Sequence, residues 1–562
     1  MKKILFFQII LLLISCASKS KYEVIIRNGL VCDGSGSASY KGDLAINGDT
    51  IAAIGNLRNA HGITEIDAGG KAVAPGFINM LSWADKSLIE DGRSQSDIRQ
   101  GVTLEVMGEG WSDGPLNEAM KKDEIEKQGD IKYDITWNTL GGYLDFLEKK
   151  GVSTNIASFV GATTLRIYAI GYDNRPPAPE EMTTMKRLAA QAMEEGAIGI
   201  SSALIYAPAS FSKTDELVEL CKEVSKYNGM YISHIRSEGD NLLASLDELI
   251  KISKNAHIKA EIYHLKAAGT ENWYKMDMAI KKIDSARIAG MDITANMYNY
   301  TAAGTGLYAT MPQWVQEGGQ DAWLARLKDP AIKARVIKEM KAPGKDWENF
   351  FYMVGSPENI ILGVFKTDSL KYLTGKTLKE VAELKRLSPA ETIIYLVVND
   401  NSPVESMFFL MTEDNIKKQI ALPWVSFGSD EQSLATEGVF LKSNPHPRAY
   451  GNVSRLLGKY TREEKIIPLV EAVRKLTSLP ALNMKINKRG LLKPGYFADV
   501  VVFDPNTIID RATYVNPHQY STGVSDVFVN GKQVLKNGEH TGAKPGRVVR
   551  GPGYKTGNVT RN

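Results

Sequence analysis

Cysteine and histidine are both scarce in this chain, whose 562 residues include three cysteines and seven histidines. Three cysteines are too few for a disulfide framework. Cys32 and Cys221 lie in apolar stretches, so we expect both as buried free thiols. The net charge is only +3 and no block of lysine and arginine occurs, so no nucleic-acid partner is expected. Hydrophobic residues make up 43% of the chain, enough for a sizeable core.

The N-terminus carries the pattern of an export signal. Lys2 and Lys3 precede an apolar run, 4–14, that is too short to span a bilayer, so residues 1–15 are predicted to be a signal peptide. The run ends in Leu13-Ile14-Ser15-Cys16, which resembles a bacterial lipobox. The resemblance implies lipidation of Cys16, hence a surface or periplasmic-side lipoprotein that touches the membrane only through this anchor. The alternative is ordinary cleavage near Ala17.

The sequence at both ends of the mature chain predicts short antiparallel strands. Residues 22–72 alternate apolar and polar side chains between turn motifs such as Asp33-Gly34-Ser35-Gly36, and the same texture returns at 490–536. We expect residues 16–72 and 481–562, the latter with a surface tail, to pair into one small β-sandwich.

The middle of the chain, residues 73–480, alternates strand and helix patterns, which is typical of parallel βα units. Eight apolar runs predict an α/β fold, a (β/α)8 TIM-type barrel. They are Ala72–Leu81, Val102–Gly108, Asn155–Val160, Ala197–Leu204, Met230–His234, Lys259–His264, Met291–Asn296 and Pro423–Phe427.

A long connection separates the seventh run from the eighth. It is too long for an ordinary βα loop, so an insertion is expected at about residues 310–390. Its sequence is helical in pattern, charged and aromatic. A mobile lid over the active-site mouth and a set of extra surface helices are both open interpretations.

Polar residues of metal-site type end three of these runs. His234 and His264 end two predicted strands, and Asp430 follows the last one. The C-terminal ends of barrel strands converge on one face, where these side chains are expected to meet. Two imidazoles can hold zinc, and a carboxylate can handle the proton of an attacking water, so the pattern indicates a metal-dependent hydrolase.

The motifs around these residues resemble the N-acyl-D-amino-acid deacylases (D-aminoacylases) of the amidohydrolase superfamily. The resemblance runs from about Tyr22 to Gly551. The motifs that carry it are Gly196-Ala197-Ile198-Gly199-Ile200-Ser201-Ser202, Ser233-His234-Ile235-Arg236-Ser237-Glu238, His264-Leu265-Lys266, Gly428-Ser429-Asp430, His446-Pro447-Arg448 and Lys493-Pro494-Gly495-Tyr496-Phe497-Ala498-Asp499.

The resemblance implies roles for individual residues. It makes His234 and His264 the imidazole ligands of a tightly held zinc and Asp430 the general base and acid. Substrate-holding roles fall to Tyr206 and Tyr298, near the scissile amide, and to Arg448, on the amino acid's carboxylate. Lys266 is expected to support the site from behind its neighbouring ligand. The two tyrosines could instead simply pack the mouth of the barrel.

The chain departs from the family at two points. Leu81 and Trp83 stand where the superfamily carries His-x-His after the first strand, so the second metal position is expected to be absent. Glu109 aligns with the cysteine that the deacylases use after the second strand. We therefore predict one zinc per chain, held by Glu109, His234 and His264. Alternatively, Glu109 only forms a salt bridge at the rim, and Glu105, deeper in the strand, is a weaker candidate.

The predicted function is zinc-dependent hydrolysis of the amide bond of N-acyl-D-amino acids, with a small-molecule substrate. One alternative is a related amidohydrolase on another amide, such as a cyclic amide or a D-amino-acid dipeptide. Another is a catalytically inactive, lipid-anchored binding protein, suggested by the loss of His-x-His. Retention of His234, His264 and Asp430 argues for an enzyme.

Overall fold

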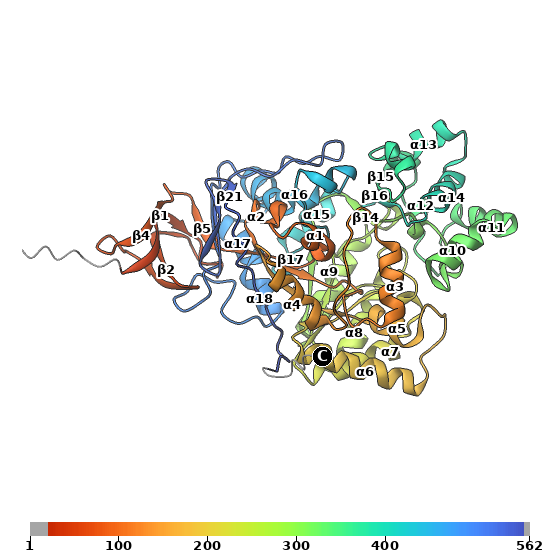
Figure 1. Cartoon of the computed structure of the whole chain (residues 1–562), viewed down its shortest axis with the longest axis horizontal. Helices are drawn as coiled ribbons and strands as arrows, with labels where there is room; N and C mark the ends of the chain where they lie inside the picture. The colour runs from red at the N-terminus through yellow and green to blue at the C-terminus, as the bar shows by residue number, and fades with distance from the viewer. Residues whose placement is uncertain (1–20, 345, 556–562) are drawn as a thin grey trace, which may run out of the picture.

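The computed structural model describes residues 21–344 and 346–555. The predicted signal peptide and Cys16 lie outside the described residues. Figure 1 shows a curled β-sheet at one end of the molecule, a barrel in the centre and a helix-rich insertion at the other end. The site discussed below lies in the barrel, on the side that faces the insertion.

The centre of the molecule is a barrel of parallel strands. The strands follow one another around the barrel axis in chain order, and the last strand lies beside both the strand before it and the first strand. The strands are β6 (Phe77–Asn79), β7 (Val102–Met107), β8 (Asn155–Ser158) continued by β9 (Val160–Gly161), β10 (Gly199–Ala203), β11 (Met230–His234), β12 (Ala260–Ile262), β13 (Ile293–Met297) and β17 (Val425–Phe427). The predicted α/β barrel is confirmed, and each predicted run overlaps at least one of these strands.

Backbone hydrogen bonds close the barrel between its first and last strands. The amide of Met80 donates to the carbonyl of Phe427 (3.1 Å), and the amide of Asp430 donates to Leu81 (2.9 Å). Ser82 and Glu431 continue this parallel pairing. The closure therefore holds the segment after β6 directly against Asp430.

The first predicted run, Ala72–Leu81, contains two strands that are separated at Gly76. The boundary between the β-domain and the barrel, expected between residues 72 and 73, therefore lies at Gly76. Strand β5 (Ala72–Pro75) pairs with strands of the curled sheet, and the barrel begins only with β6. A Cβ atom at Gly76 would lie 2.1 Å from the Thr103 hydroxyl, so only glycine fits this crossing. Both segments are buried and apolar, so the sequence pattern predicts a single strand.

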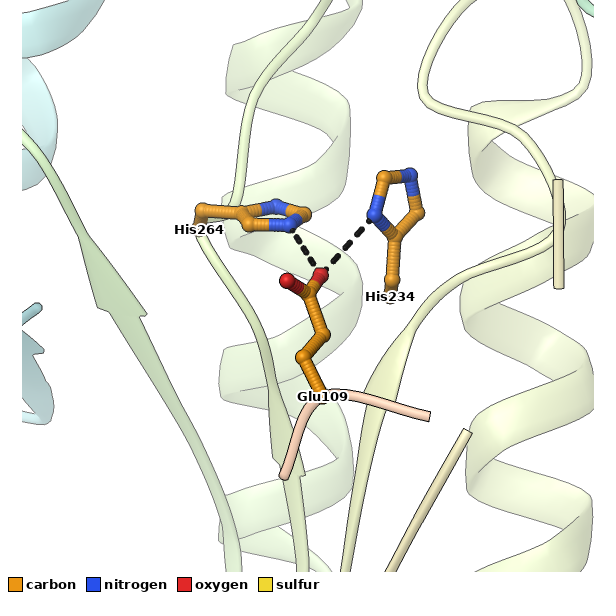
Figure 2. A group of neighbouring side chains, drawn as sticks. All are labelled: Glu109, His234 and His264. Carbon is orange, nitrogen blue, oxygen red and sulfur yellow. Dashed lines mark hydrogen bonds and ion pairs between the residues drawn. The ribbon is translucent and has the colours of Figure 1, made fainter. Parts of the chain in front are cut away.

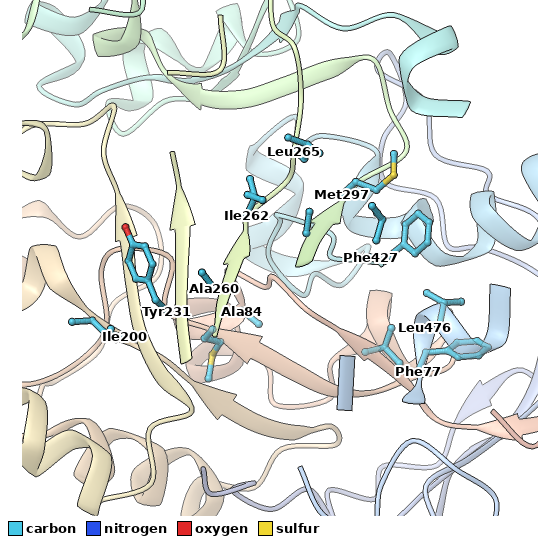
Figure 3. Close-up of a cluster of buried hydrophobic side chains, with 14 of the residues drawn as sticks. Phe77, Ala84, Ile200, Tyr231, Ala260, Ile262, Leu265, Met297, Phe427 and Leu476 are labelled. Atoms are coloured by element: carbon cyan, nitrogen blue, oxygen red, sulfur yellow. The ribbon is translucent and has the colours of Figure 1, made fainter. Parts of the chain in front are cut away.

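Amphipathic helices surround the barrel. In α8 the residues Leu242, Leu246 and Leu249 recur at helical spacing and are buried against the strands. The helices around the barrel are α1 (Ala84–Glu90), α2 (Gln95–Ile98), α3 (Glu118–Lys127), α4 (Leu140–Lys150), α5 (Ala162–Ile170), α6 (Pro179–Glu194), α7 (Thr214–Ser225), α8 (Leu242–Ala256), α9 (Lys275–Ile288), α15 (Glu413–Ala421), α16 (Arg448–Arg455), α17 (Leu469–Leu476) and α18 (Ser478–Asn483). Figure 3 shows part of the core between strands and helices, with Phe77 beside Leu476.

Both ends of the chain build the small β-domain, as predicted. It is one nine-stranded sheet. Its strands are β1 (Tyr22–Val31), β2 (Tyr40–Asn47), β3 (Thr50–Gly55), β4 (Gly62–Asp67), β5, β18 (Val500–Phe503), β19 (Val524–Val529), β20 (Lys532–Lys536) and β21 (Glu539–His540). A bridge between Thr50 and Phe497 curls the sheet around its own apolar cluster, which includes Ile26, Leu44 and Val500.

The C-terminal tail lies along the barrel. The amide of Gly546 donates to Val152 (2.8 Å) and that of Gly551 to Gly196 (2.8 Å), so the tail binds at the N-terminal ends of β8 and β10. Cys32 and Cys221 are buried free thiols, as predicted. Among helices of the described part of the chain, none combines the length and apolarity needed to cross a bilayer.

The insertion is larger than predicted and is not purely helical. It begins with β14 (Ala302–Gly306), which pairs antiparallel with β16 (Glu405–Phe409), and β16 pairs with β15 (Ile360–Val364). Its helices are α10 (Gly319–Leu327), α11 (Pro330–Met340), α12 (Phe350–Met353), α13 (Leu378–Lys385) and α14 (Pro389–Asp400). It has its own hydrophobic core, and the short strands were hidden in the sequence by the longer helical patterns around them.

We predict that Phe77→Ala destabilises the protein by about 3–5 kcal/mol, because the cavity left by a large buried side chain refills only partly. Phe77 is fully buried and packs edge-on against Phe503 of the curled sheet. Denaturant unfolding followed by circular dichroism measures the change. Ile63→Ala, at a position that is 75% exposed, is the control and should lie near wild type. Equal stability of both variants would contradict this packing.

Candidate active site

The strand alternation aims His234 into the barrel. In β11 the side chains of Met230 and Ile232 belong to the cluster inside the barrel, whereas Tyr231 packs against the outer helices. Successive side chains of a strand point to opposite faces, so His234 continues the inward set. It ends the strand with its side chain over the barrel interior and is 4% exposed.

Two other site residues depend on left-handed backbone. His264 follows β12 with φ 31° and Asp430 follows β17 with φ 53°. Non-glycine residues rarely adopt this conformation, which costs about 1–3 kcal/mol and occurs where the surrounding structure enforces it. The turn in the backbone brings both side chains to the place where His234 points.

The carboxylate of Glu109 lies between the two imidazoles (Figure 2). Its Oε1 atom is 2.7 Å from Nε2 of His264 and 3.1 Å from Nδ1 of His234. The three candidate ligand atoms lie within 4.8 Å of one another, and all three residues are buried. The structure therefore brings together the three residues predicted as metal ligands.

The cluster attracts positive charge. Burial opposes ionisation of Glu109, but the adjacent His264 and His234 outweigh it and hold the pKa of this carboxyl well below its usual range. Burial and Lys266 oppose protonation of His264, yet Glu109 and Glu238 raise its pKa to about 9. The field that draws a proton to His264 also favours a divalent cation bound by the same groups.

Glu238 lies on the other side of both imidazoles. Its Oε1 is 3.1 Å from Nδ1 of His264, and its Oε2 is 3.6 Å from Nε2 of His234. Nε2 of His234 has no hydrogen-bond partner among the described residues. A carboxylate behind a ligating histidine is the usual arrangement that fixes the ring and its tautomer. The donor set, with a carboxylate in front and one behind, fits a bound metal.

Lys266 contacts both Glu238 and His264. Its Nζ atom is 2.6 Å from Oε1 of Glu238 and 2.7 Å from Nδ1 of His264. Glu238 had no predicted role, although it lies four residues after His234 in Ser233-His234-Ile235-Arg236-Ser237-Glu238. That spacing was the only feature of the sequence that indicated Glu238, because its contact with His264 depends on the fold.

Glu105 plays no part in the cluster. It accepts hydrogen bonds from Ser82 (2.9 Å) and Thr154 (2.8 Å) on the outer side of β7. Burial and nearby Asp97 raise its pKa to about 8, so it is protonated at neutral pH. Among the described residues, the ion-pair partners of Glu109 are the two histidines and no lysine or arginine. The rim salt bridge considered for Glu109 is therefore not formed.

Trp83 has a contact that sequence reasoning missed. Its indole N–H donates to Oε2 of Glu109 (3.2 Å) and to Oδ1 of Asp430 (3.0 Å). The sequence indicated only that this residue cannot bind a metal. The structure shows that it joins the cluster to Asp430 through a single donor.

Asp430 is also held from the opposite side. Nη2 of Arg448 is 2.9 Å from its Oδ2 and donates to its backbone carbonyl (2.6 Å). Burial raises the pKa of Asp430 despite the favourable charge of Arg448. The sequence predicted Arg448 as a group that holds the substrate, and in the structure it also pairs with Asp430. Its Nε and Nη1 atoms have no partner among the described residues.

The two predicted tyrosines lie beside the cluster. The Tyr206 ring is 5.2 Å from His234, and the Arg448 guanidinium stacks over Tyr298 at 4.2 Å. The hydroxyl of Tyr298 is buried without a hydrogen-bond partner among the described residues. Both tyrosines line a cavity of about 590 Å³, together with the cluster, Asp430 and Arg448. Its outer wall comes from the insertion, through residues such as Tyr308 and Met407.

Fold and site together define a metal-dependent hydrolase of the barrel class. The chain belongs to the amidohydrolase family, whose model matches residues 64–535. It is 32% identical to the D-aminoacylase of Alcaligenes xylosoxydans xylosoxydans over 539 residues, which cover 95% of this chain and 99% of that protein.

Two solved structures have the same fold. One is N-acyl-D-glutamate deacylase from Bordetella bronchiseptica with zinc and a phosphonate mimic of the tetrahedral intermediate (TM-score 0.78, 27% identity, 94% of this chain and 100% of that one). The other is a D-aminoacylase described in terms of one-metal activation and second-metal attenuation (TM-score 0.78, 29% identity, 94% and 100% covered).

We predict that Glu109→Gln lowers the metal content of the purified protein well below that of wild type, because the anionic ligand between the imidazoles is lost. Plasma mass spectrometry gives metal per chain. Glu105→Gln is a matched control, since a protonated glutamate and a glutamine carry the same charge. Full metal content in Glu109→Gln, or equal loss in both variants, would contradict the assignment.

Proposed function

We propose that this protein is a zinc-dependent hydrolase of N-acyl-D-amino acids, releasing a carboxylic acid and a D-amino acid. The observation that carries this is the Glu109–His234–His264 cluster, linked through Trp83 to Asp430 in one cavity. The D-aminoacylase and the N-acyl-D-glutamate deacylase that it resembles along almost their whole lengths support the same reaction.

One zinc per chain fits the residues present. Glu109, His234 and His264 would hold it, and Glu238 would orient both imidazoles. Bound there, zinc lowers the pKa of water and polarises the amide carbonyl. Leu81 and Trp83 supply no ligand for a second ion, which agrees with a mechanism based on a single metal.

Asp430 is the group placed to move the proton. Its carboxylate shares the Trp83 N–H with Glu109, so it faces the metal cluster from the cavity side. It takes the proton of the attacking water and returns it to the nitrogen of the leaving D-amino acid. Burial raises its pKa and so strengthens it as a base, while Arg448 keeps the ionised form accessible.

The remaining side chains bind the substrate. The unpaired Nε and Nη1 atoms of Arg448 suit the α-carboxylate of an N-acyl amino acid. The free hydroxyl of Tyr298 and the ring of Tyr206 border the position of the amide. A complete cluster of this kind is not needed by a protein that only binds its ligand, so we favour the enzyme over the inactive binding protein.

We also propose that the enzyme acts outside the cytoplasm, anchored by a lipid on Cys16. The lysines, the apolar run and the lipobox-like Leu13-Ile14-Ser15-Cys16 support this address. Metabolic labelling with a radioactive or clickable fatty acid, compared between wild type and Cys16→Ser, tests it. Absence of label in the wild-type protein would refute the anchor.

We expect Asp430→Asn to lower kcat by about 10²–10⁴-fold, the usual contribution of a positioned general base. Zinc content should stay at the wild-type level, because Asp430 is not a ligand. Hydrolysis of an N-acetyl-D-amino acid and plasma mass spectrometry give the two readouts. Activity within a few-fold of wild type would remove Asp430 from the mechanism.

We expect Trp83→Phe to keep the fold and the zinc but to lower kcat about tenfold or more. The ring is preserved, but the N–H that aligns two carboxylates is lost, and hydrogen bonds to charged groups are among the stronger ones. Trp111→Phe is a matched control at another cavity tryptophan, one without a hydrogen bond to either carboxylate. Equal kinetics for both variants would show that the Trp83 N–H does no positioning.

A further inference from the structure

The insertion places one carboxylate in the wall of the active-site cavity. Glu405 begins β16 and pairs with Gly306 of β14, while Met407 pairs with Gly304. Paired residues of antiparallel strands share a face, and so do residues two apart on one strand. A Cβ atom at Gly304 would lie 3.0 Å from Nη2 of Arg448, so this face of the sheet is turned toward Arg448. Both Glu405 and Met407 line the cavity.

The position of Glu405 along the strand sets its separation from Arg448. It lies two residues beyond Met407, a step of about 7 Å at the rise of a β-strand. The residue opposite it, Gly306, has no side chain, and the ring of Tyr308 occupies the space beside Gly306. Glu405 is exposed, and it lines the same cavity as Arg448.

Glu405 has no partner in the described part of the chain. Its carboxylate takes part in none of the hydrogen bonds or ion pairs there, unlike the other carboxylates that line the cavity. Those partners are the imidazoles and Trp83 for Glu109, Lys266 for Glu238, Arg448 for Asp430, backbone amides for Glu431, and lysines for Asp85, Glu124 and Asp130.

Among the described residues that line the cavity, no lysine or arginine forms an ion pair with Glu405, and Arg448, whose charge does reach Glu405, is paired with Asp430. The lysines that line the cavity are already paired with other carboxylates: Lys86 with Asp113, Lys127 with Asp123, Lys266 with Glu238 and Lys442 with Asp130. Desolvation by the surrounding protein raises the pKa of Glu405 to about 7, Glu431 and Asp430 add to the effect, and Arg448 opposes it. An ionised carboxylate in such surroundings is stabilised by a cation that enters with the ligand.

We propose that Glu405 selects substrates with a cationic side chain, so that the preferred class is N-acyl derivatives of basic D-amino acids. This rests on the proposed function and names its substrate class. Arg448 would hold the α-carboxylate, and Glu405 would meet the ammonium or guanidinium at the far end of the side chain. A lysine-type side chain carries its charge on a flexible four-carbon stem, which suits the separation along the strand.

The test compares kcat/KM for N-acetyl-D-lysine and N-acetyl-D-norleucine, which lacks only the terminal ammonium. The zinc-loaded wild-type enzyme should favour the lysine derivative, and Glu405→Gln should lower the lysine-to-norleucine ratio about tenfold or more. Glu405→Lys should reverse the ratio and improve turnover of N-acetyl-D-glutamate relative to norleucine. Glu383→Gln, an exposed position on α13 of the same insertion, is the matched control and should keep the wild-type ratio.

Zinc content and circular dichroism of each variant separate a binding effect from loss of fold. If wild type hydrolyses N-acetyl-D-norleucine as well as N-acetyl-D-lysine and Glu405→Gln leaves the ratio unchanged, the role of Glu405 is overturned while the proposed function stands. If wild type, loaded with zinc, hydrolyses none of these N-acetyl-D-amino acids, the proposed function itself fails. Binding of free D-lysine but not D-norleucine, lost in Glu405→Gln, would support the same contact without turnover.

Discussion

The architecture of the site depends on one buried carboxylate between two imidazoles. Glu109 is 4% exposed, and a charge removed from water so completely must be compensated nearby. His234 and His264 supply that compensation only because β11 and β12 are neighbouring barrel strands and because the backbone of His264 is left-handed. The same geometry is what a zinc ion needs, so the constraint on folding and the requirement for metal binding coincide.

A second set of contacts fixes the position of the Glu109–His234–His264 cluster relative to the other residues of the cavity. Glu238 and Lys266 fix the far sides of the imidazoles, while Trp83 and Arg448 hold Asp430 from two directions. Trp83 reaches both carboxylates because the segment after β6 pairs with the segment after β17. The backbone pairing that closes the barrel between β6 and β17 therefore also joins the predicted metal ligands to the proposed base, Asp430. The insertion supplies the opposite wall, where Glu405 and Met407 face the substrate space.

Much of this could be predicted from the sequence, for physical reasons that differ between residues. The eight strands were predictable from apolar runs, and His234, His264 and Asp430 from their positions at strand ends, because strand ends converge whatever the details of packing. Glu109 followed from its place in a motif. The division at Gly76 was hidden because two buried segments of different sheets are equally apolar. The strands of the insertion were hidden by the helices around them. The contacts of Trp83 and Glu238 join distant segments, which no local pattern contains, and the same holds for the pairing of Arg448 with Asp430.

The central claim is that a single metal binds between Glu109, His234 and His264. Crystals soaked in zinc, with anomalous X-ray data collected on both sides of the zinc absorption edge, test it most directly. The account predicts one anomalous peak per chain among these three side chains, with zinc–nitrogen distances of about 2.0–2.1 Å and zinc–oxygen distances of about 2.0–2.2 Å. A second peak of similar height beside Trp83, or the absence of a peak at the cluster, would contradict it.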